Sequence, residues 1–199
     1  MRRRLCLIGL PLALAGCGGV LSRPYLPRQD WALAVPFPDA RPPRRGGKVL
    51  LVRSVQAAPA LGDRGLTTLA PDGAMQTDFY NRWAVPPAEG VGSALRQYLA
   101  ESGLFAAVLA PGSLAQAGLT LEAELMQLWT EPGARRAVAS LSIVLLATGG
   151  ATPHVLLQAT ESATSPLAPG ADAGGEVAAQ LAALADVFRE TTAALARFA

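Results

Sequence analysis

The chain has 199 residues, enough for one or two domains, and its 17 basic and 15 acidic residues give a formal net charge of +2. This near-neutral balance excludes a large basic surface for nucleic acid and a long acidic tail. One histidine and two cysteines are too few for a protein-only zinc site or a cysteine-based redox motif. The apolar content of 51% comes from Ala, Leu and Val, because aromatic residues are only 6%.

The first sixteen residues have the pattern of an export signal. Three arginines at positions 2–4 precede the apolar run Leu5–Ala15, whose 11 residues are too few for a membrane span, which needs about 20. The run ends in Leu-Ala-Gly-Cys at positions 14–17, which resembles the lipobox of bacterial lipoproteins. That resemblance implies cleavage before Cys17, a thioether-linked diacylglycerol on its sulfur, and acylation of its new amine with a chain such as palmitate. The alternative is an ordinary signal peptide with a chance cysteine.

Cleavage at this site changes the charge and the thiol count. The mature chain, residues 17–199, loses three arginines and keeps 14 basic against 15 acidic residues, a net charge of −1. It has no free thiol for a disulfide, so its stability must come from core burial. Several acyl chains, at about 0.8 kcal/mol per buried CH₂, give durable attachment. Gly18 in place of Asp resembles the outer-membrane sorting pattern, which predicts an outer-membrane lipoprotein facing the periplasm.

The expected organisation is a signal peptide at 1–16, a lipidated N-terminus and tether at 17–30, and one domain at 31–199. Alternating or continuous apolar runs predict the strands. The expected strands are Trp31–Pro36, Lys48–Val55, Leu66–Leu69, Ala74–Ala84, Phe105–Leu109, Leu119–Met126, Arg135–Ala147 and His154–Ser162.

Two helices are expected, at Ala88–Ser102 and Glu176–Phe198. The first follows Pro86-Pro87, which favour a helix start, and carries Val91, Leu95, Tyr98 and Leu99 at helical spacing. The second has a 4-3 apolar stripe that lacks the charge pairs of a coiled coil, which favours packing on its own sheet. Together these elements predict an α/β (α+β) fold, a single compact domain with a mixed or antiparallel sheet and two main helices on it.

Candidate catalytic chemistry is sparse. The only histidine, His154, follows Pro153 at a predicted turn, and no serine lies in a G-x-S-x-G context. Glu122 and Glu124 share one strand face, which we expect to be solvated. The pairs Arg44-Arg45 and Arg135-Arg136 are too short for a nucleic-acid surface. These features disfavour an enzyme and predict no cofactor and no metal.

The segment D-F-Y-N-R-W-A-V-P-P, residues 78–87, carries family information. It follows the V-L-L-V strand and a loop, and it precedes an amphipathic helix ending in G-L-F-A-A-V. In this setting it resembles the ABC-type transport auxiliary lipoproteins (PqiC-like), from about Trp31 to the C-terminus. The loop from Ala57 to Gly73 departs from the family pattern, because it is richer in Ala, Gly and Asp and lacks a Tyr-Leu pair.

The resemblance implies a fold similar to the N-terminal domain of TolB. It also implies a non-enzymatic component of an MCE-type ABC system that moves phospholipid or other hydrophobic molecules between the inner and outer membranes. The implied partners are the MCE-domain protein, the membrane through the anchor, and further copies of the chain in a homo-oligomeric ring. The alternative is an envelope scaffold or assembly lipoprotein with a similar domain and no role in transport.

Tyr80, Arg82 and Trp83 match the family motif and have two interpretations. As interface residues they would contact the transporter partner or another subunit, because Trp, Tyr and Arg are enriched at interface hot spots. As structural residues, Trp83 would lie in the core and Arg82 would pair locally. Both interpretations stay open at the level of the sequence.

Overall fold

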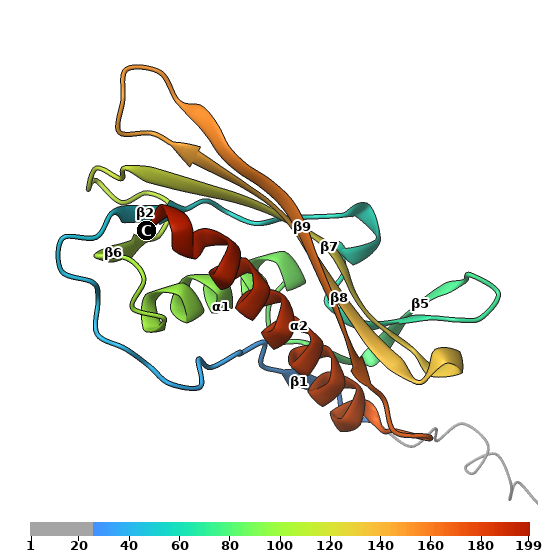
Figure 1. Cartoon of the computed structure of the whole chain (residues 1–199). Helices are drawn as coiled ribbons and strands as arrows, with labels where there is room; N and C mark the ends of the chain where they lie inside the picture. Colours follow the sequence, from blue (N-terminus) through green and yellow to red (C-terminus); the bar gives the residue numbers. More distant parts are fainter. Residues whose placement is uncertain (1–25) are drawn as a thin grey trace, which may run out of the picture.

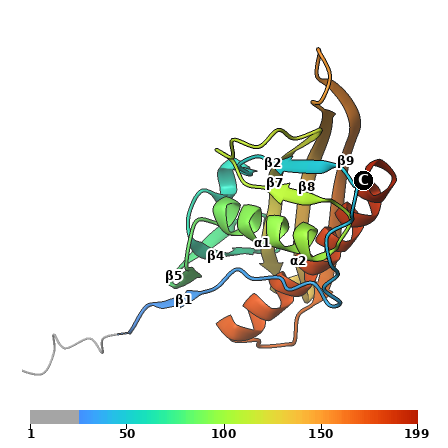
Figure 2. The same cartoon turned by 90° about the vertical axis from the view of Figure 1, so that its left-hand side faces the viewer.

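The structure, a computed structural model, describes residues 26–199 as one nine-stranded mixed sheet with two main helices. This confirms the expected fold class. The signal peptide, Cys17 and the first part of the tether lie outside the described residues. Figures 1 and 2 show helices α1 (Pro87–Glu101) and α2 (Ala173–Leu195) on the same face of the sheet. There the rings of Tyr98 and Phe188 meet edge to face at 5.5 Å and join the two helices in one core.

Strand β7 (Leu119–Glu131) is the centre of the sheet. One edge pairs antiparallel with β8 (Arg136–Ala147), which pairs antiparallel with β9 (His154–Pro166). The other edge pairs in parallel with three short strands in turn. These are β2 (Val49–Val52), β3 (Gln56–Ala57) and β4 (Gly65–Leu69). Beyond them lie β6 (Ala107–Leu109) against β2, β5 (Met75–Trp83) against β4, and β1 (Gln29–Trp31) against β5.

Three short 3₁₀ turns complete the chain: Pro59–Leu61, Pro132–Ala134 and Ala196–Phe198. The second of them is the turn between β7 and β8. Strands β7, β8 and β9 form an antiparallel meander of three long strands.

Strand β7 continues five residues beyond the expected end at Met126. The predicted alternation places Leu119, Leu121 and Leu125 in the core, but the pairing with β8 shifts register between Leu125 and Gln127. Met126 has no partner in β8 and forms a β-bulge. The bulge reverses the alternation of buried and exposed side chains, so that Leu128 is the next buried leucine. The prediction stopped where the period of two is interrupted.

The predicted strand at 48–55 is shorter in the structure, because β2 ends at Val52 and pairing with β7 resumes only at Gln56, in β3. Val52 pairs with Leu121 and Gln56 with Glu124, so four steps along this segment match three along β7. The additional residue interrupts the pairing and opens a hollow beside Ser54.

The first strand also differs from its prediction at 31–36, because β1 covers only Gln29–Trp31. The apolar residues that follow pack without pairing. Val35 is buried in the core, and Leu33 lies against the start of α1, where a Cβ on Gly90 would approach it at 3.1 Å.

Both predicted helices are present. In α1 the predicted stripe of Val91, Leu95, Tyr98 and Leu99 is buried. Helix α2 begins three residues before Glu176, because the Asp172 carboxylate accepts a hydrogen bond from the Gly175 backbone N–H at 2.9 Å and caps the first turn. Its apolar stripe packs mainly on β8 and β9, so the helix covers its own sheet.

Candidate interaction surface

The family motif forms a wide bulge in β5. Gly65 of β4 pairs with Arg82 and Thr67 pairs with Thr77, so only Leu66 lies opposite the segment 78–81. Residues 78–81 therefore leave the plane of the sheet at a point between two regular stretches of pairing. The bulge turns the aromatic pair Phe79 and Tyr80 outward, and their exposed fractions are 62% and 41%.

The Asp78 carboxylate holds the bulge in shape. It accepts hydrogen bonds from the backbone N–H groups of Tyr80 at 2.7 Å and Asn81 at 3.1 Å, and from the Asn81 side-chain amide at 2.8 Å. Partial burial on its own would raise the pKa of Asp78. The bonds from the Asn81 side chain and the two backbone amides outweigh it and hold the pKa below its ordinary value of 3.8. The ionised carboxylate is thus the form that stabilises the bulge.

Gly65 makes room for the bulge from the neighbouring strand. A Cβ at this position would collide with the backbone carbonyl oxygen of Asp78 and with the Thr77 methyl group. The conformation of Gly65 itself is ordinary, so glycine is required here by the close approach of two strands.

The three motif residues have separate environments. Trp83 is 1% exposed and belongs to the core, as its structural interpretation requires. The Arg82 guanidinium pairs with Asp30 of β1 at 2.9 Å, and Arg64 reaches the same carboxylate at 3.0 Å. Tyr80 alone of the three projects outward from the bulge.

Two residues that the sequence analysis did not single out complete this surface. The Arg28 guanidinium lies 3.9 Å from the centre of the Phe79 ring, a cation–π contact. The Phe79 and Tyr80 rings meet edge to face at 5.2 Å. We call Arg28, Phe79 and Tyr80 the aromatic tip. The signal for the bulge was present in the Asp-x-x-Asn spacing of residues 78–81, but nothing in the sequence joins Arg28 to a ring 51 positions away.

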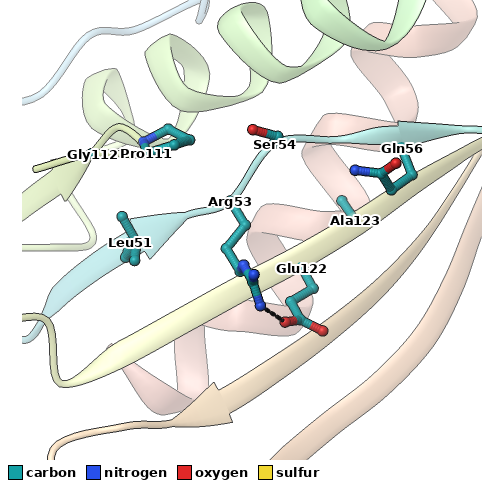
Figure 3. Close-up of a pocket in the computed structure, with 8 residues that line it drawn as sticks. All are labelled: Leu51, Arg53, Ser54, Gln56, Pro111, Gly112, Glu122 and Ala123. Atoms are coloured by element: carbon teal, nitrogen blue, oxygen red, sulfur yellow. Dashed lines mark hydrogen bonds and ion pairs between the residues drawn. The ribbon is translucent and has the colours of Figure 1, made fainter.

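A second surface feature lies over the break between β2 and β3 (Figure 3). The hollow is lined by Leu51, Arg53, Ser54, Gln56, Pro111, Gly112, Glu122 and Ala123. Its only two charged groups, Arg53 and Glu122, form an ion pair at 2.6 Å and are both well exposed. The neighbouring Glu124 is exposed on the same face, which is solvated as predicted. The two charges of this hollow are therefore paired with each other.

His154 is exposed at the start of β9. No three His, Cys, Asp or Glu side chains within residues 26–199 gather closely enough to hold a metal ion. Over the same residues, neither helix combines the length and apolar character that a membrane crossing needs.

Comparison with known proteins agrees with this architecture. The model of the ABC-type transport auxiliary lipoprotein component family matches residues 31–191, and the chain belongs to that family of auxiliary transport lipoproteins. A search of curated proteins returns no match.

Solved structures share the fold at low identity. Protein XCC0632 from Xanthomonas campestris is 20% identical with a TM-score of 0.66, over 80% of this chain and 87% of that one. An uncharacterized protein is 15% identical with a TM-score of 0.61, over 86% and 98% of the two chains. The hypothetical protein CT253 from Chlamydia trachomatis is 13% identical with a TM-score of 0.52, over 76% and 96%.

The first prediction concerns Gly65. Replacement by Ala places a Cβ against Asp78 and Thr77, and we expect the free energy of unfolding to fall by about 1–3 kcal/mol. Gly118→Ala is the matched control, because a Cβ there meets open space and its φ is not left-handed. Urea unfolding of both variants measures the difference. Equal stabilities would contradict the close approach.

The second prediction separates the motif residues. Trp83→Ala should lower the free energy of unfolding by about 3–5 kcal/mol, because it leaves a large cavity in the core. Arg82→Ala removes a partly exposed ion pair and should cost at most about 1 kcal/mol. Thermal and urea unfolding test both variants. A larger loss for Arg82→Ala than for Trp83→Ala would show that these assignments are wrong.

The third prediction concerns the protonation of Asp78. Its pKa is lowered in the folded state, so its stabilising bonds are complete above pH 3.8 and are lost as the pH falls through the lower folded value. We expect the amide NMR shifts of Tyr80 and Asn81 to titrate with a midpoint below 3.8. The titration should vanish in Asp78→Asn.

A local measurement is needed for this prediction because Glu176 titrates nearby with the opposite shift. Burial raises the pKa of Glu176, and the charge of Asp78 raises it further. A measurement of global unfolding in acid would combine the protonation of Asp78 with that of Glu176. The control Glu176→Gln removes the second carboxylate and should leave the Asp78 titration below its ordinary value. A midpoint at or above 3.8 in this control would contradict the bonding described for the bulge.

Proposed function

We propose that the protein is a periplasm-facing accessory lipoprotein of an MCE-type ABC transport system. In this role it supports the movement of phospholipid or other hydrophobic molecules between the inner and outer membranes, and so the integrity of the envelope. The observation that carries the proposal is membership of the auxiliary transport lipoprotein family over residues 31–191. The Leu-Ala-Gly-Cys sequence at 14–17 agrees with the lipoprotein character of that family.

Attachment through Cys17 is the first part of the proposal. The acylated cysteine holds the domain at the periplasmic surface of the outer membrane, the destination that Gly18 favours. Residues 18–28 are a short tether before β1. The acyl chains would hold the folded domain at the membrane surface. The residues of the domain are then available for contacts with other molecules.

A binding role is the second part. The described surface offers contact features and no catalytic cluster. Within residues 26–199, strand β9 pairs only with β8, along one of its two edges. Its 13 residues leave one row of backbone donors and acceptors open to another strand. This supports an interaction with the MCE-domain protein or with further copies of the chain in a ring.

The anchoring proposal is tested with Cys17→Ser. This variant lacks the sulfur that would receive the diacylglycerol, so we expect acylation to be lost and the protein to move from the membrane to the soluble periplasmic fraction. Metabolic labelling with a fatty acid and membrane sedimentation measure the two effects. Cys6→Ser is the matched control, because Cys6 lies within the expected signal and should leave both unchanged. A Cys17→Ser protein that still sediments with membranes contradicts the anchor.

The transport proposal is tested by partner capture and by deletion. The tagged full chain should co-purify with an MCE-domain protein after cross-linking in intact cells, and a strain lacking it should become sensitive to detergent. Complementation with the wild-type chain restores resistance, while Cys17→Ser should not. An anchored protein that captures no MCE-domain protein, with unchanged detergent resistance in the deletion strain, overturns the transport role. It would favour the alternative of an envelope scaffold.

A further inference from the structure

Large apolar side chains are exposed unevenly over the described surface. Seven of them are at least 39% exposed, and four belong to β5 or to the segment just before β1. These four are Leu26, Met75, Phe79 and Tyr80. The remaining three lie elsewhere: Leu114 in the loop after β6, Met126 at the bulge of β7 and Val155 near the start of β9. Exposed aromatic residues that cluster in this way indicate a contact site.

The fold holds the aromatic tip in position. Asp78 fixes the bulge with three hydrogen bonds, Gly65 gives it space, and Arg28 lies over the Phe79 ring. Phe79 and Tyr80 are not among the side chains of the core. The bulge thus holds two rings in a fixed position facing solvent. Because they lie outside the core, they contribute little to the free energy of folding.

The tip also lies where the chain leaves the domain. Arg28 directly precedes β1, which lies beside β5 at one end of the molecule, as Figure 2 shows. Eight residues, 18–25, lie between Cys17 and Leu26, and the nine steps from one to the other span about 30 Å at full extension. The membrane surface is therefore within reach of this end of the sheet.

We propose that the aromatic tip inserts into the headgroup region of the membrane that holds the anchor. This inference rests on the proposed lipid attachment at Cys17. Aromatic rings favour the membrane–water interface, and an arginine beside them is attracted to anionic lipid phosphates. Two exposed rings in a bulge suit a lipid surface better than a protein partner, whose stable interface needs about 800 Å² on each side.

Insertion sets the orientation of the domain. In the order β1-β5-β4-β7-β2-β6, the strands that carry the tip are at one end of the sheet. The opposite end, with β6 and the loop after it, then points away from the membrane. Leu114 lies in that loop and is fully exposed, which makes it a control position for membrane contact.

The first experiment places a dye at the tip. The chain from residue 18 contains no cysteine, so Tyr80→Cys and Leu114→Cys each give a single labelling site for nitrobenzoxadiazole. A histidine tag in place of Cys17 tethers the protein to vesicles of phosphatidylethanolamine and phosphatidylglycerol that contain a nickel-chelating lipid. Because this tether replaces acylation, the result does not depend on whether Cys17 is lipidated in cells.

We expect the dye at position 80 to shift to the blue on vesicles and to be quenched by lipids with a nitroxide on the acyl chain. The dye at 114 should keep its emission in buffer. A dye at 80 that stays in an aqueous environment on the tethered protein overturns the proposal. Another outcome is a dye that is shielded from water in intact envelopes but not on vesicles that hold only the tethered protein. That result would assign the tip to a protein contact and would also overturn the proposal.

The second experiment measures affinity without any tether. The untagged chain from residue 18 is sedimented with vesicles rich in phosphatidylglycerol. The double variant Phe79→Ser, Tyr80→Ser should bind at least about tenfold more weakly, since both interfacial rings are lost. Leu114→Ser, which removes an equally exposed side chain at the other end, should bind as the wild type does. Equal binding by all three chains contradicts insertion.

Discussion

Strand β7 forms hydrogen bonds along both of its edges, and the positions of the other strands follow from this. On one side it is half of a continuous hairpin with β8, and on the other it receives β2, β3 and β4 one after another. Strands of two to five residues have little stability alone, so they depend on a long partner that is already in place. The meander of β7, β8 and β9 joins residues close in sequence, and it supplies that partner without a long loop closure.

The parts of the fold that could be predicted are those whose signal is local. The stripe of α1 and the alternation in β7 record burial within one element, and both are present. The prediction was wrong where pairing with a distant strand sets the boundary. Leu33 and Val35 belong to the apolar segment 31–36 that was predicted as a strand, yet they pack on neighbours without joining a ladder. The break at Arg53 arises from one extra residue relative to β7, which no pattern within residues 48–55 reveals.

The candidate surface follows the same division. Family resemblance drew attention to Tyr80, Arg82 and Trp83, but only the folded chain separates a core residue, a local ion pair and an outward ring. Phe79 was not singled out from the sequence, and its exposure follows from its place in the bulge. The transport role is a property of the family and of its partners. The geometry of this chain contributes the contact surfaces through which such a role would operate.

The close approach of Gly65 to the bulge links two positions that are not neighbours in sequence. A relative that shortened residues 78–81 to an ordinary pairing would no longer bring a carbonyl oxygen over position 65, and any small side chain would then be tolerated there. A relative that kept the bulge would have to keep glycine. The two sites should therefore change together during evolution, and glycine at this position would mark the family members that retain the bulge.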